Sequence, residues 1–343
     1  MLNGLLVCIA ASGKNTASSA SGFNFIASFI PQTSFTKLMA KVTIDRIDDK
    51  SDLPVWARIV LVIIAFLFIG GIFQFFGALI SGVSLKEMSA VKDISLDRHL
   101  VMQLSGFLGT MLVVYLFWCL IDKQPIKRLG FATQGIVADI VLGLVVALVI
   151  IGGGTLILMA MGALTITSIN VHVPSLLYTF ALFIIVSLNE EILMRGYILN
   201  TLMMRYNRFV GLFVSSLLFA LMHGMNANIT WLSMLNLFLA GVILGSVYIY
   251  TRNLWFPISL HLFWNYLQGP VLGYAVSGMP IKSLVSHKTM GNDTLTGGLF
   301  GFEGSILCSI LVSLFALALI LYYRKKEQAL LAQRAAQPVD HLG

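Results

Sequence analysis

Two adjacent carboxylates and a guanidinium interrupt a long apolar stretch of this 343-residue chain. Glu190, Glu191 and Arg195 follow residues 176–188, which contain no charged side chain. An ionised side chain near the centre of a bilayer costs about 2.5–3.5 kcal/mol even on the most lenient scale. Two such groups side by side therefore need an explanation.

Three more polar side chains occur farther along the chain with helical spacing. His223 follows Phe219 by four residues and Asn265 follows His261 by four, and residues so spaced share one face of a helix. A buried carboxylate can act as a general base, and an opposing imidazole can share the proton. A second imidazole and an amide NH2 can donate hydrogen bonds to an oxyanion. These groups suit hydrolysis of a peptide bond by activated water, without a covalent acyl-enzyme.

The composition is that of a membrane protein, with 58% hydrophobic and 11% charged residues. Globular chains are closer to half apolar and a quarter charged. The net charge of +7 is scattered over many short loops, which favours membrane orientation and excludes a nucleic-acid-binding stripe. Cys8, Cys119 and Cys308 lack metal-ligand spacing and predict neither a disulfide framework nor a zinc knuckle.

Apolar segments recur along the chain, most of them near or above the roughly 20 residues that a membrane-crossing helix needs. There are eight, at 59–80, 102–121, 135–163, 174–195, 209–223, 230–250, 254–275 and 304–323. The fifth is short, and the fourth continues as a helix toward Met204. We expect an all-α polytopic membrane protein whose approximately eight transmembrane helices enclose an intramembrane polar cavity.

The basic residues of the loops predict the orientation. With the amino terminus inside, 17 of the 22 Lys and Arg residues fall in inner segments and five in outer loops. Basic loops stay on the cytoplasmic side, so both termini are expected there. No feature indicates the endoplasmic reticulum, and we expect a multi-pass protein of a bacterial inner membrane.

The spacing places the polar side chains at one depth. Glu190 lies 17 residues before Asn207 (207 − 190), the tip of a predicted helical hairpin, and His223 lies 16 after it (223 − 207). At 1.5 Å per residue both are about 25 Å from the tip. His261 follows Arg252, which marks the inner surface, by nine residues (261 − 252), or about 13 Å. The depths agree if the hairpin tip projects about 12 Å into the cytosol.

The remaining polar residues have simpler interpretations. Arg195 lies near the inner interface, where its guanidinium can extend to water or reach back to Glu191. Phe219 is expected in the core, and Asp139 and Glu303 lie at segment ends, where solvation suffices. A lone intramembrane His or Asn is usually a hydrogen-bond partner between helices. Five polar groups that are costly to bury in a membrane converge at one depth, and this convergence favours a hydrated pocket. They are Glu190, Glu191, His223, His261 and Asn265.

The organisation along the chain is expected to comprise four parts. They are an amino-terminal extension (1–53), the first two transmembrane helices (54–134), a catalytic core (135–275), and the last loop with the eighth helix and a cytoplasmic tail (276–343). Residues before Met39 lack the basic region of a signal peptide, and we expect translation to start at Met39. The segment 277–299 is expected to be a plain exposed link.

The three motifs resemble a known family. Glu190-Glu191-x-x-x-Arg195, Phe219-x-x-x-His223 and His261-x-x-x-Asn265 match, in order and without departure, the motifs of the CPBP family. This family contains the CAAX proteases and bacteriocin-processing enzymes and is also called the Abi family. The resemblance covers roughly residues 135–274, and residues 127–131 are similar to the family as well.

The resemblance implies a fold, an activity and roles. It implies an eight-helix intramembrane protease core in which Glu190 and His223 activate water while His261 and Asn265 form the oxyanion site. Eukaryotic members remove the terminal tripeptide of prenylated CAAX proteins, and many bacterial members are of unknown substrate or are linked to bacteriocin immunity. The partners implied are membrane lipid and a membrane-bound or lipidated peptide or protein substrate.

Two alternatives remain open at this point. A catalytic zinc needs three protein ligands and a water, and Glu190 or Glu191 together with His223 and His261 could supply the three ligands. The chain lacks a His-Glu-x-x-His motif, and family members are described both as metalloproteases and as metal-free glutamate proteases; we expect no metal cofactor. The competing class is a non-catalytic immunity or scaffold protein, or a small-molecule transporter, although the inverted repeats typical of transporters are not visible.

Overall fold

The structure is a computed structural model that describes residues 47–84, 87 and 95–336. The expected extension over residues 1–53, including Met39, lies almost wholly outside the described residues. The remaining domain boundaries stay predictions.

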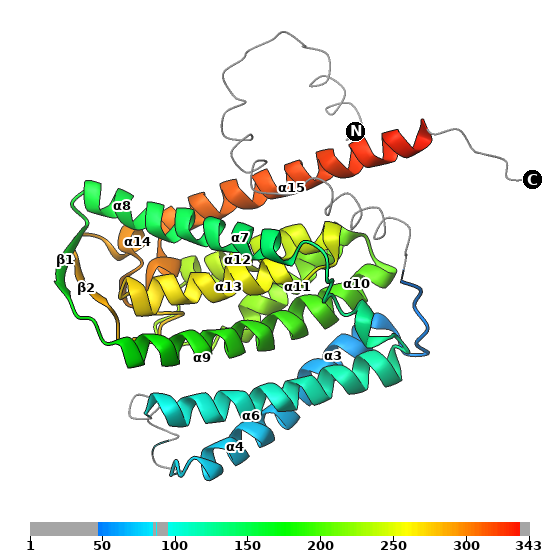
Figure 1. Cartoon of the computed structure of the whole chain (residues 1–343), viewed down its shortest axis with the longest axis horizontal. Coiled ribbons are helices and arrows are strands. Elements are labelled where there is room, and N and C mark those ends of the chain that lie inside the picture. The colour runs from blue at the N-terminus through cyan, green and yellow to red at the C-terminus, as the bar shows by residue number, and fades with distance from the viewer. Residues whose placement is uncertain (1–46, 85–86, 88–94, 337–343) are drawn as a thin grey trace, which may run out of the picture.

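Helices make up most of the described chain (Figure 1). The first half contains α3 (Val55–Ala65), η1 (Phe66–Gly70), α4 (Gly71–Ile80), α6 (Leu96–Tyr115), η3 (Leu116–Ile121), η4 (Ile126–Arg128), α7 (Ile136–Ala147), η5 (Leu148–Gly152) and α8 (Gly153–Ala160). After strand β1 (Leu164–Ile169) follow α9 (Val173–Glu191), η6 (Ile192–Leu199), α10 (Asn200–Arg205), α11 (Arg208–Met222), α12 (Trp231–Thr251), α13 (Trp255–Tyr266) and η7 (Leu267–Val271). Strand β2 (Val285–Thr289) precedes α14 (Asp293–Thr296), η8 (Gly298–Phe300), η9 (Phe302–Gly304) and α15 (Ile306–Ala335).

Several of these elements join into continuous helices that are long and apolar enough to cross a membrane. Within the described residues there are six: Val55–Ile80, Leu96–Ile121, Ile136–Ala160, Val173–Arg205, Trp231–Thr251 and Ile306–Gln333. Their outward faces carry many exposed large apolar side chains, as expected for surfaces that contact lipid. The chain is therefore an all-α polytopic membrane protein, as the sequence predicts.

The expected number of about eight spanning helices is wrong, because two of the predicted segments are too short. Helix α11 has 15 residues, or about 22 Å against about 30 Å of hydrocarbon. Helix α13 continues only through η7 to Val271, although the apolar sequence runs to Ala275. It ends there because Pro270 offers no backbone N–H and Gly273 adopts a φ of +82°.

Both short helices begin at the same end of the molecule, and only α13, through η7, continues to the other end. At one end Arg252, which follows α12, donates a hydrogen bond to Asn200 of α10. Arg208 at the start of α11 pairs at this end with Glu327 of α15, at 2.9 Å. At the other end β1 and β2 pair, so the connections that follow α8 and η7 lie together (Figure 1).

The segment 277–299 is not a plain link, contrary to the sequence-based expectation. It contains β2, which pairs antiparallel with β1 and has an irregularity between Ile166 and Ser168. The β-branched residues of β1, whose sequence is LTITSI, suit a strand. The pairing ties two connections that are more than 100 residues apart in sequence.

Helix α13 lies between α7 and α9 (Figure 1), and its close contact with α7 fixes its position. A Cβ on Gly143 of α7 would lie 2.6 Å from the backbone nitrogen of Leu260. The Ser259 hydroxyl donates to the carbonyl of Ile140 at 2.7 Å. Helices approach this closely only where a small residue is present. The next residue after Leu260 is His261, so this contact sets where His261 lies.

The motif-like segment 127–131 supports the start of α13. The backbone N–H of Leu254 donates to the carbonyl of Gly130 at 2.8 Å. The indole N–H of Trp255 donates to the carbonyl of Ala132 at 2.9 Å.

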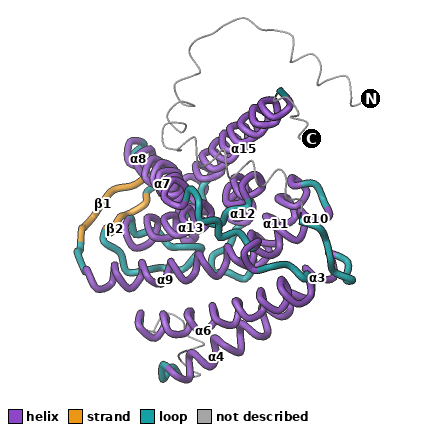
Figure 2. The backbone as a smooth tube through the Cα atoms, turned by 45° about the vertical axis from the view of Figure 1, so that its right-hand side comes forward, coloured by secondary structure: helices purple, strands orange, loops and turns teal. Residues whose placement is uncertain are grey.

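Helices α3, α4 and α6 form a separate layer that meets the rest through α6 and α9 (Figure 2).

Two carboxylates that the sequence places at solvated segment ends are in fact buried. Asp139 is 8% exposed and accepts a hydrogen bond from the Asn253 side chain at 2.6 Å. Glu303 is 6% exposed and accepts from the indole N–H of Trp264 at 2.9 Å. Folded connections cover both side chains, and an apolar-segment pattern does not reveal such coverage.

Candidate active site

The α10–α11 hairpin brings Glu190 and His223 together. Asn207 lies at its tip, where its side-chain oxygen accepts from the backbone N–H of Phe209 at 2.8 Å and caps α11. Glu190 Oε2 lies 3.7 Å from His223 Nε2. The structure therefore brings together the two residues that the sequence places at one distance from the hairpin tip.

A second imidazole faces the same carboxylate oxygen. His261 Nε2 of α13 lies 3.9 Å from Glu190 Oε2. Both separations exceed the range of a direct hydrogen bond, and Glu190 Oε2 is buried with no hydrogen-bond partner among the described residues. The side chains of Glu190 and His223 are 28% and 18% exposed, so the group is accessible from outside the protein.

Glu191 has a different environment from its neighbour. Its Oε1 accepts from Arg195 Nη1 and lies against His261 Nδ1, both at 2.8 Å. The Glu191 and Arg195 side chains are 0% and 1% exposed. Of the two expected positions for the guanidinium, the structure has the one that reaches back to Glu191; it does not extend to water.

Hydrogen bonds fix the orientation of both imidazole rings. His223 Nδ1 lies 2.7 Å from the carbonyl oxygen of Phe219. A carbonyl only accepts, so Nδ1 carries the hydrogen and Nε2 of the neutral ring is an acceptor. His261 has the equivalent arrangement, with Nδ1 against the Glu191 carboxylate. Both Nε2 atoms thus point toward Glu190 Oε2.

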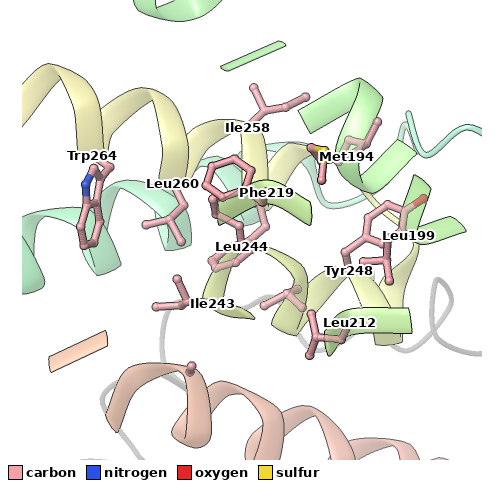
Figure 3. Close-up of a cluster of buried hydrophobic side chains, with 14 of the residues drawn as sticks. Met194, Leu199, Leu212, Phe219, Ile243, Leu244, Tyr248, Ile258, Leu260 and Trp264 are labelled. Carbon is pink, nitrogen blue, oxygen red and sulfur yellow. The ribbon is translucent and has the colours of Figure 1, made fainter. Parts of the chain in front are cut away.

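Phe219 is buried at 4% exposure, as expected, and it also contacts the polar residues. Its ring centroid lies 4.6 Å from that of His223 and 6.2 Å from that of His261. The Arg195 guanidinium lies 4.8 Å from the ring centroid, a cation–π distance. Apolar side chains such as Leu244 and Leu260 surround Phe219 (Figure 3). Phe219 is a shared support for the three polar side chains.

Gly241 of α12 is a site residue that the sequence reasoning missed. Its carbonyl oxygen accepts from Arg195 Nη2 at 3.1 Å. A Cβ at this position would lie 2.7 Å from Cα of Ser216 on α11. Gly241 and Gly245 are four residues apart in an apolar helix, a spacing typical of close helix packing, and this signal could have identified the contact.

Asn265 lies one turn beyond His261 on α13, as the spacing predicts. It is 6% exposed. Within the part of the chain that the structure describes, its side chain makes no hydrogen bond. Its NH2 group is therefore available to a ligand.

The donor set suits zinc in kind but not in spacing. Metal-bound His residues usually hold their second ring nitrogen against a carboxylate or carbonyl, as His261 and His223 do here. The 3.7 and 3.9 Å separations from Glu190 exceed the roughly 3.4 Å between tetrahedral ligands at zinc bond lengths. No group of three His, Cys, Asp or Glu side chains among the described residues is arranged to hold a metal ion.

These observations define a helical membrane protein in which two carboxylates and a buried guanidinium of one spanning helix meet two imidazoles, one at the end of α11 and one in α13. Residues 172–267 match the family model described as type II CAAX prenyl endopeptidase Rce1-like. The match contains all three motifs, and the resemblance to the CPBP family is confirmed over these residues. It is a family of membrane endopeptidases.

A curated protein gives a similar but shorter match. The chain is 36% identical over 93 residues to an Escherichia coli protein named "Uncharacterized 24.3 kDa protein". The matched region is 26% of this chain and 42% of that relative's length. The similarity thus covers less than half of either protein.

The different surroundings of the two carboxylates predict different effects on stability. Glu191→Ala leaves the buried Arg195 without its carboxylate, and we expect the free energy of unfolding to fall by about 3–5 kcal/mol. Glu190→Ala removes a partly exposed side chain without a cationic Arg or Lys partner, and we expect a loss below about 1 kcal/mol. Denaturant unfolding of both variants in the same detergent measures this difference. Equal losses would contradict the assignment of Glu191 as the structural partner of Arg195.

Proposed function

We propose that the protein is an intramembrane endopeptidase that hydrolyses peptide bonds with a water molecule activated by Glu190 and His223. The observation that carries this proposal is the position of Glu190 Oε2, a buried oxygen without a hydrogen-bond partner among the described residues that two imidazole Nε2 atoms face. Polar atoms separated by more than about 3.5 Å are commonly bridged by water. A water bound between Glu190 and His223 can donate to both.

The proposed reaction has two steps. The water oxygen attacks the substrate carbonyl carbon while Glu190 takes a proton from the water. The electron pair of the carbonyl double bond moves onto the carbonyl oxygen. The tetrahedral intermediate then collapses, the C–N bond breaks, and the proton passes to the leaving amine. The products are a carboxylic acid and an amine, and the enzyme returns to its starting state. His223, with its ring fixed by the Phe219 carbonyl, holds the water and shares the proton.

His261 and Asn265 are assigned to the developing oxyanion. The Asn265 NH2 donates from α13, and His261 donates from Nε2 when that atom is protonated. Glu191 holds the His261 ring in the orientation that this role needs, so it acts by positioning. Donors fixed in advance stabilise the charge without reorganisation at the moment of reaction.

The proposed substrates are membrane-bound or lipidated peptides and proteins. A site on membrane-embedded helices is reached most directly by a substrate already in the bilayer, and the matched family model carries the description of a prenyl endopeptidase. We propose the bacterial inner membrane as the location, with both termini cytoplasmic. The alternative is a non-catalytic immunity or scaffold protein, or a transporter, whose polar pocket only binds a ligand.

The first test of this proposal is substitution of the water-activating pair. We expect Glu190→Gln and His223→Ala each to lower cleavage of a membrane-tethered peptide library by about 10²–10⁴-fold, the range for loss of a general acid–base group. Asn265→Ala removes one oxyanion donor, and we expect about 10²–10³-fold loss with slight residual activity. Wild-type turnover by folded Glu190→Gln, with unchanged melting temperature, would exclude the hydrolase and favour the binding protein.

A second test addresses the metal. We propose that hydrolysis is metal-free and expect activity to survive dialysis against a chelator. Elemental analysis of the active protein should then give far less than one zinc per chain. Loss of activity that returns only with added zinc would contradict the proposal, and would assign Glu190, His223 and His261 as the ligands.

A third test addresses orientation. We expect a reporter enzyme that works only in the cytoplasm to be active when it is fused after Tyr323. A reporter that works only in the periplasm should be inactive at the same position. The excess of Lys and Arg in the predicted inner segments is the physical reason. A periplasm-dependent reporter that is active at this position would reverse the proposed topology.

A further inference from the structure

Glu303 is a buried carboxylate to which the proposed reaction gives no role. It belongs to η9, in the connection between β2 and α15, and is 6% exposed. Its Oε1 accepts from the Trp264 indole N–H at 2.9 Å. Its Oε2 accepts from the backbone N–H and the hydroxyl of Ser277, each at 2.9 Å. Both oxygens are thus acceptors, the role of an ionised carboxylate.

The first of these contacts reaches the helix that holds His261 and Asn265. Trp264 lies between these two residues in the sequence of α13, directly before Asn265. It is 6% exposed and part of the buried core (Figure 3). Because a helix is stiff over one turn, fixing the Trp264 side chain restricts the rotation and axial position of the turn that holds His261 and Asn265.

The second contact leads to His223 by a chain of hydrogen bonds. The Asn226 side chain donates to the carbonyl of Ser277 at 3.2 Å. The backbone N–H of Asn226 donates to the carbonyl of His223 at 3.0 Å. From Glu303 the chain therefore passes through Ser277 and Asn226 to the residue that faces Glu190.

The backbone around Glu303 is itself anchored, so the carboxylate is a fixed point. The Asn236 side chain of α12 donates to the carbonyl of Glu303 at 2.7 Å and to that of Ser305 at 2.8 Å. The Ser309 hydroxyl of α15 donates to the oxygen of the same Asn236 amide at 2.6 Å. These bonds hold η9 against two long helices.

We propose that Glu303 is a positioning residue that sets the separation between His223 and the pair His261 and Asn265. It connects the end of α11 to α13 from the side where β1 and β2 pair, whereas Glu191 holds His261 from α9. This inference rests on the proposed function only for its effect on cleavage. Its effect on the local structure is measurable in any folded sample.

The test uses two substitutions that remove the same hydrogen bond from its two sides. In Glu303→Gln one oxygen becomes an NH2 donor; the remaining oxygen can keep both Ser277 donors, so the NH2 faces the Trp264 N–H and this hydrogen bond is lost. Trp264→Phe removes the indole donor and keeps the carboxylate. Trp118→Phe is the matched control, because Trp118 is fully buried and donates from its indole to the carbonyl of Pro125 at 3.1 Å.

We expect kcat of Glu303→Gln and of Trp264→Phe to fall by about 10–100-fold, as for a small misplacement of reacting groups, with KM within about twofold of wild type. The double variant should lose much less than the product of the two single losses, because both remove one bond. Trp118→Phe should lower the melting temperature and leave kcat unchanged. Wild-type kcat in Glu303→Gln, or an equal fall in Trp118→Phe, would overturn the proposal.

Hydrogen–deuterium exchange provides a measure that does not need activity. We expect faster exchange of the amides in residues 223–230 and 261–266 in Glu303→Gln, and wild-type exchange there in Trp118→Phe. Unchanged exchange of both segments in Glu303→Gln would overturn the positioning role. If the wild-type protein cleaves no peptide but Glu303→Gln still shows the faster exchange, the proposed function is overturned. The link between the two segments then stands.

Discussion

One carboxylate oxygen organises the site. Glu191 Oε1 meets both the Arg195 guanidinium and the His261 imidazole at 2.8 Å, in a part of the protein that water does not reach. Removing one member of a buried charged pair leaves the other without compensation, which is why such contacts are costly to alter. The Phe219 ring and the Gly241 carbonyl then hold the guanidinium from two further sides. Glu190, its neighbour, remains free of such bonds and open to a reactant.

The sequence predicts which polar side chains meet better than it predicts what surrounds them. Nearly equal spacing of Glu190 and His223 from Asn207, 17 and 16 residues, is enough to place them together, because an antiparallel helical hairpin converts similar sequence distances into similar depths. The helical spacing of His261 and Asn265 likewise survives in the structure. The sequence cannot show how the imidazole rings are oriented, since their Nδ1 partners include a backbone carbonyl.

The failures have physical reasons of a different kind. Apolar composition continues past Val271, so it does not show where α13 ends. Pairing of β1 with β2 depends on two connections that meet in space, and the sequence of neither strand identifies the other as its partner. Asp139 and Glu303 occupy segment ends, where exposure is the usual outcome, but folded connections cover them. Local patterns therefore predict which polar side chains lie together, while contacts between distant segments decide what surrounds them.

The shortness of α11 has a consequence for the lipid beside it. A helix of 15 residues is about 8 Å shorter than the hydrocarbon layer. Membranes respond to such hydrophobic mismatch by thinning, or by drawing headgroups and water toward the short helix. His223 follows the last residue of α11, so thinning of this kind would occur close to Glu190. A polar peptide backbone that approached from the membrane would then cross less hydrocarbon there than along the full-length helices.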